Sequence, residues 1–409
     1  MGVKHEPARA RLATRLAAWI VLFAAIIAAL QISSLAGLFL LAKIKHIAYA
    51  PVSESISPAQ RRMLENLLAG RTVWFVHSPD LGWTIKRNGH APLYRANSEG
   101  IRADREFGRA PIDGVLRIAA FGDSFMYGAD VDNKDTWEEM LMRAHRNVEV
   151  LNFGVGGYGT DQAFLRYQRE GRAYKPDVVL IGFFSDNIYR NVNVYRPFYT
   201  GNTDIPLAKP RFVLRNGALV LLPNPLPMLG QYRDLLADPV RALSQFGQHD
   251  YFFQSRYHAG GFAFLPSVRL YQIVRSRVVT PGTEIDQNGH YNVNSEAFKV
   301  TAAIIDQFVE AVQQAGSVPV IVAMPSAWDI ETDRIHGEKM YAPLLEHFQT
   351  RGYRYVDLLE GFQHYGGSMA VGQLAPGHYS PAGNELVAKA LWEYLAKNRL
   401  VDPKALRSH

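Results

Sequence analysis

The chain of 409 residues contains no cysteine. Disulfide bridges, thiolate zinc sites and a cysteine nucleophile are therefore excluded. The absence also fits a compartment in which stray thiols would be oxidised. Positive charge is modest as well, because the formal net charge is +6 and the basic residues form no stripe interleaved with aromatics. Nucleic acid is therefore not an expected partner.

Motifs for cofactor or metal binding are also missing. The glycine-rich segment Gly154–Gly157 lacks the Gly-Lys-Ser/Thr ending of a P-loop, and no acidic residue follows it at the distance of a dinucleotide fingerprint. The histidines His336, His347 and His364 are not spaced as metal ligands are. The sequence therefore predicts no cofactor and no metal. Low-complexity tracts and internal repeats are likewise absent.

One long run without formal charge lies near the N-terminus, from Leu16 to Ala42. It is long enough to span a bilayer with some tilt. More positive charge precedes it than follows it: Lys4, Arg9, Arg11 and Arg15 against Lys43 and Lys45. The positive-inside rule then predicts a cytoplasmic segment 1–15, a transmembrane anchor 16–42 and an extracytoplasmic remainder, which is periplasmic if the cell is Gram-negative.

A cleaved signal peptide is the alternative interpretation of this run. Ala48-Tyr-Ala50 has the small-x-small pattern of a cleavage site. The apolar core of a signal peptide usually spans about 7–15 residues, however, and this run is much longer. An uncleaved anchor, giving a single-pass membrane protein, is the favoured prediction.

Beyond the anchor, the residue pattern divides the chain into three regions. Residues 43–114 have the glycine, proline and asparagine punctuation of turns between short strands, and we interpret them as a membrane-proximal connector. From 115 to 398, apolar strands alternate with amphipathic helices, and 399–409 form a C-terminal tail. A region rich in aromatics and prolines, at about 195–290, interrupts this alternation. It is either a surface insertion with its own small core or a lid over a substrate site.

The alternating region predicts an α/β fold. Apolar, β-branched runs indicate the strands: Leu116–Phe121, Val148–Phe153, Asp177–Phe184, Val318–Ala323 and Tyr353–Leu358. Helices are expected between them, and Ser295 and Ser380 are placed as the N-caps of two of these. Strands separated by helices favour a three-layer α/β/α sandwich around a central parallel sheet.

The segment that carries most chemical information runs from Leu116 to Gly128, with the sequence LRIAAFGDSFMYG. An apolar strand breaks at Gly122 and delivers Ser124 onto the turn where a helix begins. The backbone N–H groups at a helix N-terminus favour negative charge. A serine in this position is exposed and has donors for a developing oxyanion, as an activated nucleophile requires.

Three further blocks are expected at the same edge of the sheet, because the carboxyl ends of parallel strands meet there. Asn152-Phe-Gly-Val-Gly-Gly157 offers unobstructed backbone N–H groups. Phe183-Phe-Ser-Asp-Asn187 places polar side chains directly after a buried strand. Gly377-His-Tyr-Ser-Pro-Ala-Gly383 presents His378 before the terminal helix. Serine, histidine and converging donors are the parts that acyl transfer needs.

The four blocks, in this order, resemble those of the SGNH (GDSL-type) hydrolase superfamily of esterases and lipases, and the likeness covers about 115–398. The resemblance implies an SGNH fold, which is flavodoxin-like. It also implies that Ser124 is the nucleophile and His378 the general base. The oxyanion donors implied are the N–H groups of Ser124 and Gly157, with the side chain of Asn187 assisting.

Two departures from the family pattern stand out. The third block of the family usually reads Asn-Asp, whereas here the order is Asp186-Asn187, so the asparagine position could fall on Asp186. A carboxylate cannot donate a hydrogen bond to an oxyanion. The family also places an acidic residue three positions before the histidine, where this chain has Ala375. His378 is then oriented by a backbone carbonyl, by a carboxylate such as Asp186 or Asp329, or by nothing.

The sequence therefore predicts an extracytoplasmic, membrane-anchored serine esterase. O-acetyl groups of envelope glycans are the suggested substrate, and the oligomeric state is left open. Two alternatives remain: an O-acyltransferase with the same site, and a catalytically degenerate protein that binds or assembles glycans. The missing acidic residue before His378 favours the degenerate protein, whereas the intact serine, glycine and histidine favour an enzyme.

Overall fold

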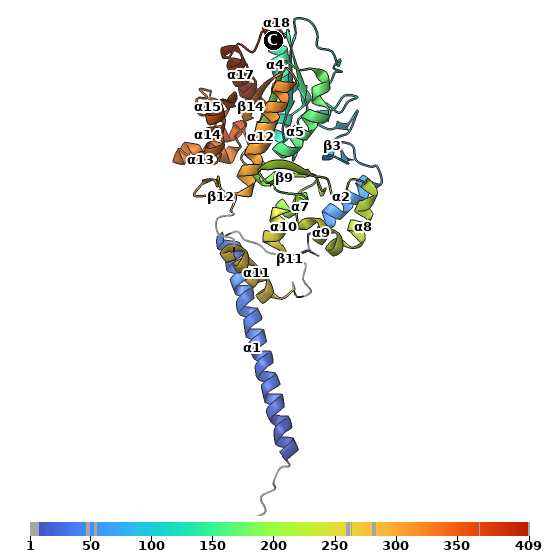
Figure 1. The fold of residues 1–409 in the computed structure, drawn as a ribbon, viewed down its shortest axis with the longest axis vertical. Helices are drawn as coiled ribbons and strands as arrows, with labels where there is room; N and C mark the ends of the chain where they lie inside the picture. Colours follow the sequence, from blue (N-terminus) through green and yellow to red (C-terminus); the bar gives the residue numbers. More distant parts are fainter. Residues whose placement is uncertain are drawn as a thin grey trace, which may run out of the picture. The chain divides into compact units, whose positions relative to one another are not determined.

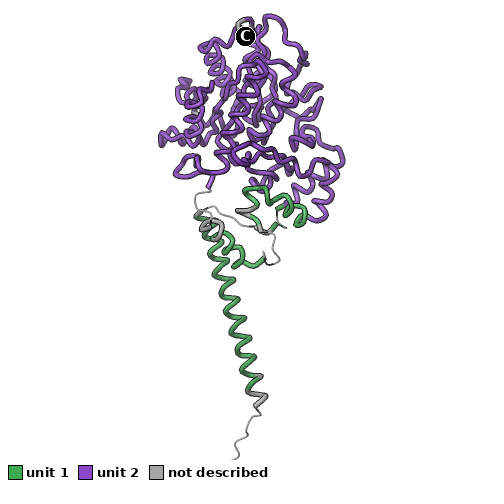
Figure 2. Tube along the Cα trace, in the orientation of Figure 1, with its two compact units in different colours: residues 1–55, 239–281 green, residues 56–238, 282–409 purple. Residues whose placement is uncertain are grey.

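The computed structural model describes residues 8–45, 50–52, 55–258, 262, 264–279, 284–367 and 369–407. The chain divides into two compact units, which Figure 2 colours separately. One unit comprises residues 1–55 and 239–281, and the other comprises residues 56–238 and 282–409. Residues 1–7, 46–49 and 408–409 lie outside the described residues, and so therefore does most of the Ala48-Tyr-Ala50 pattern.

The larger unit is built around a parallel sheet of five strands in the order β15-β14-β8-β6-β7. In chain order the strands are β6 (Leu116–Phe121), β7 (Val148–Asn152), β8 (Val178–Phe183), β14 (Val318–Ala323) and β15 (Tyr355–Asp357). Every residue of β6, β7 and β8 is buried, because helices cover the sheet on both sides. Strands buried on both faces are mostly apolar. The exceptions include Arg117 in β6 and Glu149 in β7, which form a buried ion pair at 2.6 Å.

Helices surround this sheet in two packed pairs (Figure 1). One pair is α4 (Trp137–Ala144) with α17 (Pro381–Lys397), and the other is α5 (Thr160–Arg169) with α12 (Glu296–Gln314). Both predicted caps are present, since Ser295 accepts a hydrogen bond from the Phe298 N–H and Ser380 accepts one from the Gly383 N–H. The predicted α/β/α architecture is confirmed.

The strand order locates the edge at which a site is expected. From β6 the chain moves to β7 on one side and then returns to β8 on the other, so the direction of winding reverses between β6 and β8. In doubly wound folds, ligands bind outside the carboxyl ends of the strands at this reversal. Ser124 follows β6 and Asn187 follows β8, so two of the four blocks stand at the reversal point.

Residues 56–114 pack into the larger unit as one helix and short hairpins. They comprise α2 (Pro58–Leu68), β2 (Phe75–Ser78), β3 (Gly82–Ile85), β4 (His90–Ala91) and β5 (Tyr94–Arg95). Trp83 in β3 is 1% exposed, and its indole N–H donates to the Gly156 carbonyl at 3.0 Å. The Tyr158 hydroxyl in turn donates to the Trp83 carbonyl at 2.6 Å. The hairpin therefore fixes the glycine-rich block after β7.

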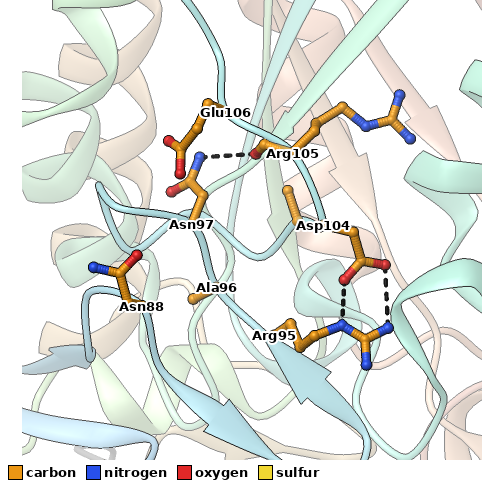
Figure 3. Close-up of a pocket in the computed structure, with 8 residues that line it drawn as sticks. Asn88, Arg95, Ala96, Asn97, Asp104, Arg105 and Glu106 are labelled. Carbon is orange, nitrogen blue, oxygen red and sulfur yellow. Dashed lines mark hydrogen bonds and ion pairs between the residues drawn. The ribbon is translucent and has the colours of Figure 1, made fainter.

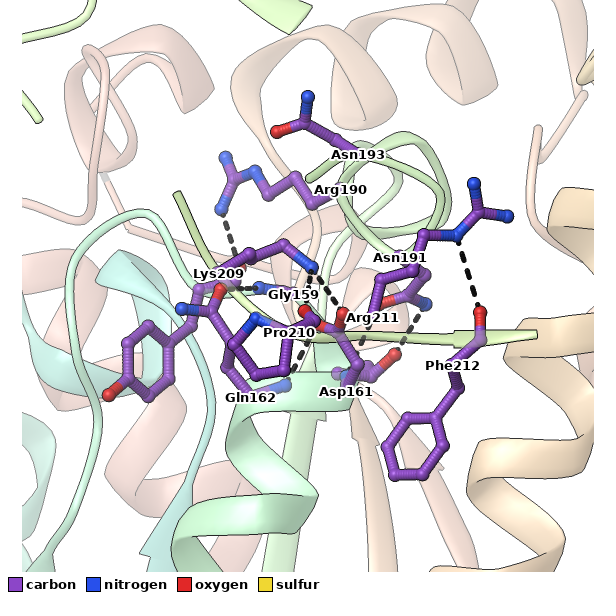
Figure 4. Close-up of polar contacts among 12 residues, drawn as sticks. Gly159, Asp161, Gln162, Arg190, Asn191, Asn193, Lys209, Pro210, Arg211 and Phe212 are labelled. Carbon is purple, nitrogen blue, oxygen red and sulfur yellow. Dashed lines mark hydrogen bonds and ion pairs between the residues drawn. The ribbon is translucent and has the colours of Figure 1, made fainter. Parts of the chain in front are cut away.

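A buried ion pair fixes the first part of the aromatic region (Figure 4). The ammonium of Lys209 contacts the carboxylate of Asp161 at the start of α5, and both side chains are almost fully buried. Burial raises the pKa of Asp161, and the neighbouring Lys209 opposes that rise. Lys209 immediately precedes a hairpin of β9 (Arg211–Arg215) and β10 (Ala218–Leu222). This hairpin belongs to the larger unit, so the region around 195–290 is shared between the two units.

The smaller unit contains the long N-terminal helix α1 (Ala8–Lys45). Its segment Thr14–Ile44 is the only helix among the described residues that is long and apolar enough to cross a membrane, and it is compatible with a signal anchor. The other elements are β1 (Ala50–Pro51), α9 (Pro239–Gly247), α10 (Tyr251–Arg256), β11 (Tyr257–His258) and α11 (Pro266–Val279). β1 pairs in parallel with β11, and α11 packs against α1.

Candidate active site

Ser124 is the first residue of α3 (Ser124–Tyr127), two residues after β6 ends. Asp123 caps this helix, and its carboxylate accepts a hydrogen bond from the Phe125 N–H at 2.9 Å. The turn is short because α3 ends after four residues at Gly128, whose φ is 73°. Ser124 is partly exposed, whereas its two neighbours are buried. The strand, turn and helix predicted around this serine are therefore present.

The carboxylate of Asp123 is held by two further side chains. Its Oδ2 accepts from Nδ2 of Asn187 at 2.9 Å and from a guanidinium N–H of Arg190 at 3.1 Å. Asp123 is 1% exposed and Arg190 is 7% exposed. These contacts bring the polar loop after β8 against the serine turn, and they give Asp123 a role in shaping the backbone around Ser124.

Asn187 does not direct its amide toward an open oxyanion position in this structure. Besides its bond to Asp123, its Nδ2 donates to the Tyr158 carbonyl at 3.3 Å. Its Oδ1 accepts from the Phe184 N–H at 3.1 Å. Both amide hydrogens are therefore bonded, to Asp123 and to Tyr158, and these bonds support the serine turn.

His378 lies against the residue that follows the serine. The centroid of its imidazole is 5.1 Å from that of Phe125, whose ring also packs against Phe184 and Tyr379. Nδ1 of His378 is 2.6 Å from Oδ2 of Asp130. This contact leaves Nε2 as the ring nitrogen that can exchange a proton with a substrate or a nucleophile.

Asp130 is therefore the carboxylate beside the histidine, and neither acid suggested from the sequence has that place. Asp186 accepts a hydrogen bond from the hydroxyl of Tyr199. Asp329 accepts from the hydroxyls of Ser185 and Ser326, at 2.9 and 2.6 Å. Asp329 is 3% exposed, and burial raises the pKa of its carboxyl.

Arg102 organises the loop that carries Asp130. Its buried guanidinium donates to the Tyr127 carbonyl at 2.8 Å and to the Val131 carbonyl at 2.5 Å, and it also bonds the Gly128 carbonyl. Burial lowers the pKa of Arg102. One arginine therefore satisfies successive carbonyls on both sides of Asp130 and fixes the course of the loop.

Tyr94 also contacts the loop that carries Asp130. Its hydroxyl accepts a hydrogen bond from the Asp130 N–H at 3.0 Å, and the guanidinium carbon of Arg102 is 4.7 Å from the centroid of its ring. Asp130 has a φ of 66°, a left-handed conformation that aspartate tolerates better than most residues. Residues of the connector therefore determine where this carboxylate lies.

A hollow of about 570 Å³ lies in the connector (Figure 3). The residues that line it are Asn88, Arg95, Ala96, Asn97, Ala103, Asp104, Arg105 and Glu106. Its polar groups are largely paired with each other: Arg95 meets Asp104 at 2.5 Å, and Nδ2 of Asn97 donates to the Arg105 carbonyl at 3.2 Å. Neither Ser124 nor His378 lines this hollow, which leaves it outside the candidate active site.

The glycine-rich block contains Gly157, the second backbone donor expected from the sequence. Gly157 has a φ of 81°, and a Cβ atom on it would meet the guanidinium carbon of Arg196 at 2.9 Å. Glycine is therefore required at this position on two grounds. Within the described residues, neither the N–H groups of Ser124 and Gly157 nor the Ser124 hydroxyl forms a hydrogen bond.

Arg196 adds a positive charge next to this block. Its Nη1 donates to the Gly157 carbonyl at 2.8 Å, and its Nε donates to the Thr203 hydroxyl at 2.8 Å. Burial, reinforced by the charge of Arg190, lowers the pKa of Arg196 to about 10. Arg196 therefore remains cationic near neutral pH. No group of acidic or histidine side chains suited to a metal ion occurs among the described residues.

The fold and this site define an α/β protein with a serine, a histidine and a carboxylate at the carboxyl edge of its sheet. Residues 118–243 match the family model of the GDSL-like lipases and acylhydrolases. This part of the chain is therefore similar to the GDSL-like lipases and acylhydrolases.

Among curated proteins, the chain resembles the uncharacterized lipoprotein YqeF of Bacillus subtilis (strain 168), with 37% identity over 76 residues. That match covers 17% of this chain and 31% of the relative, so the chain spans about a third of the length of the relative it matches.

Solved structures with a similar fold include the lipase/acylhydrolase from Enterococcus faecalis, with 14% identity and a TM-score of 0.33 over 69% of this chain and 97% of that one. A catalytic mutant of an acetylxylan esterase from Geobacillus stearothermophilus has 13% identity and a TM-score of 0.34, over 69% of this chain and 95% of that one.

Proposed function

We propose that the chain is a membrane-anchored serine esterase that acts outside the cytoplasm, with Ser124, His378 and Asp130 as its catalytic triad. The observation that carries the proposal is the 2.6 Å contact between His378 and Asp130, with the same imidazole lying on the ring of Phe125, next to Ser124. A carboxylate at Nδ1 fixes the tautomer that leaves Nε2 able to accept a proton. Asp130 supplies what the missing acid at Ala375 would have supplied.

In the proposed reaction, Oγ of Ser124 attacks the ester carbonyl and transfers its proton to Nε2 of His378. The imidazolium returns this proton to the departing alcohol as the carbon–oxygen bond of the ester breaks. The acyl group then resides on Ser124. A water molecule, deprotonated by His378, releases it as the acid and restores the serine hydroxyl.

The oxyanion of the tetrahedral intermediate rests on the N–H groups of Ser124 and Gly157. Support for this assignment comes from their position at the start of α3 and in the glycine-rich block, and from their lack of partners among the described residues. Preorganised backbone donors stabilise developing negative charge without reorganising during the reaction. Asn187 contributes indirectly, because its amide holds Asp123 and thereby the serine turn.

The substrate that we propose is an O-acetyl group of a cell-envelope glycan. Two features support it: the resemblance to SGNH hydrolases, and the charge bias around the apolar helix, which favours an extracytoplasmic main domain. A sugar hydroxyl in place of water would turn the same intermediate into an acyl transfer. The degenerate glycan-binding alternative is less well supported once His378 has a carboxylate partner.

The direct test uses the full-length chain in detergent. Ser124→Ala is expected to lower kcat/KM for p-nitrophenyl acetate by at least ~10³-fold and to abolish labelling by a fluorophosphonate probe. Ser98→Ala, a surface serine bonded to Glu106, is the matched control and keeps both signals. Unlabelled, inactive wild-type protein would refute the esterase proposal. Analysis of the products with and without an added alcohol separates hydrolysis from transfer.

A further inference from the structure

Helix α11 of the smaller unit lies against the apolar span of α1 (Figure 2). Two reciprocal hydrogen bonds join them: Nε2 of Gln31 donates to the Ser267 hydroxyl at 2.9 Å, and the Ser267 N–H donates to Oε1 of Gln31 at 3.1 Å. Further along, Gly37 faces Leu270, because a Cβ atom on the glycine would be 3.3 Å from the leucine side chain.

These contacts occur within the span and not beyond its end. Gln31 is 13 residues before Ile44, the last residue of the apolar segment, which places it ~20 Å along the helix axis from that end. A glutamine at such a depth needs a partner, since an unsatisfied amide is costly in hydrocarbon. Ser267 supplies that partner, and small residues such as Gly37 allow two helices to approach closely in lipid.

Several large apolar side chains of this second helix are exposed. Large hydrophobic residues on and just before α11 are strongly exposed: Phe262 at 69%, Phe264 at 65%, Tyr271 at 61% and Val274 at 50%. The neighbouring residues of α1 are exposed to a similar degree, as Phe39 at 62% illustrates. The exposed apolar surface of the anchor therefore continues onto α11, and it includes Tyr271, a residue type enriched at membrane interfaces.

We propose that residues 264–274 form a second membrane-contacting element, which lies in the outer leaflet beside the anchor and meets lipid through Phe264, Tyr271 and Val274. This inference rests on the anchor part of the proposed function and is independent of the esterase chemistry. The partner is a lipid surface because the exposed face is continuous with a segment that itself requires lipid. Removing this apolar area from water stabilises the arrangement.

The lack of native cysteine makes a clean depth measurement possible. The full-length chain carrying Tyr271→Cys or Phe264→Cys is spin-labelled and reconstituted into phosphatidylcholine nanodiscs. Accessibility to oxygen, which concentrates in lipid, is compared with accessibility to a water-soluble nickel chelate. Phe23→Cys in the anchor is the lipid reference, and Ile112→Cys, exposed in the larger unit, is the water reference. All four positions are exposed, so the substitutions leave the packing intact.

The oxygen-to-nickel accessibility ratio at positions 264 and 271 is expected to approach that of Phe23→Cys and to exceed that of Ile112→Cys several-fold. A ratio like that of Ile112→Cys, with Phe23→Cys still in lipid, would overturn the inference and leave the anchor standing. Protection from both reagents would also overturn it, since a protein surface would then cover the helix. If Phe23→Cys itself were in water, the anchor and the inference would fail together, while the esterase assay above would be unaffected.

Discussion

Two carboxylates flank Ser124 in sequence, and their surroundings differ sharply. Asp123 is 1% exposed and is bonded by a backbone N–H, an amide and a guanidinium. The Asp130 side chain is 68% exposed and contacts the imidazole of His378. The first carboxylate is committed to holding a turn, whereas the second meets a group that can gain and lose a proton. Position beside the proposed nucleophile therefore does not by itself assign chemistry to an acid.

The largest effect that tests this comparison is on catalysis. Asp130→Asn is expected to lower kcat for p-nitrophenyl acetate by ~10²–10⁴-fold with little change in thermal stability, because an amide at Nδ1 no longer stabilises the imidazolium. Asp132→Asn, two residues along the same loop, is the matched control and keeps its activity. Equal kcat values for the two variants would remove Asp130 from the triad.

Asp123 should respond in the opposite way, with a large loss of stability. Asp123→Ala leaves the buried Arg190 without its carboxylate, which typically costs about 3–5 kcal/mol in the free energy of unfolding. Asp123→Asn should recover part of that loss, since an amide oxygen can still accept. Chemical denaturation monitored by tryptophan fluorescence measures both variants. An unchanged unfolding midpoint for Asp123→Ala would contradict the structural role assigned here.

Arg102 extends the comparison, because it is remote from Asp130 in sequence but donates hydrogen bonds directly to the carbonyls of the Asp130 loop. Arg102→Lys cannot bond several carbonyls at once, so the loop should shift and kcat should fall by about 10–100-fold through misplacement of the carboxylate. A positioning role predicts a loss in kcat with KM nearly constant. Combining this change with Asp130→Asn should add little, whereas additive losses would indicate that Arg102 acts only on overall stability.

The smallest effect concerns pH and a carboxyl outside the site. Burial raises the pKa of Glu138, which is 1% exposed, to about 8. The folded state therefore holds a proton that the unfolded chain releases near pH 4.5. The contribution of this carboxyl to stability is full below that pH and is lost as pH rises to about 8. Glu138→Gln should flatten this decline, by roughly 2–4 kcal/mol between pH 5 and 8. Parallel melting curves across that range would contradict the assignment.

The fold was predictable because its signals are local. The run that became β8 is apolar throughout and those that became β6 and β7 are mostly apolar, and Ser295 and Ser380 cap helices where the pattern placed them. The serine turn was predictable for the same reason, since a glycine break between a strand and a helix involves neighbouring residues only.

The surroundings of the serine were not predictable to the same degree. Asp130 lies near Asp132 and Asp135 in sequence, and no local pattern distinguishes it from them. Arg102 and Tyr94 of the connector determine that Asp130 is the aspartate beside His378. Both are remote from it in sequence and contact its loop only after folding. The amide of Asn187 was likewise assigned from its order in a motif, whereas its actual bonds depend on the carboxylate of another strand's loop.

The sequence by itself determined the parallel sheet, the long apolar helix and the serine at the start of α3, because periodicity, charge and turn residues act over a few positions. Only the tertiary structure decided which acid faces His378 and which polar groups are already paired. Hydrogen bonds and ion pairs form between whatever side chains the packed backbone brings within about 3 Å, and that distance is independent of separation along the chain.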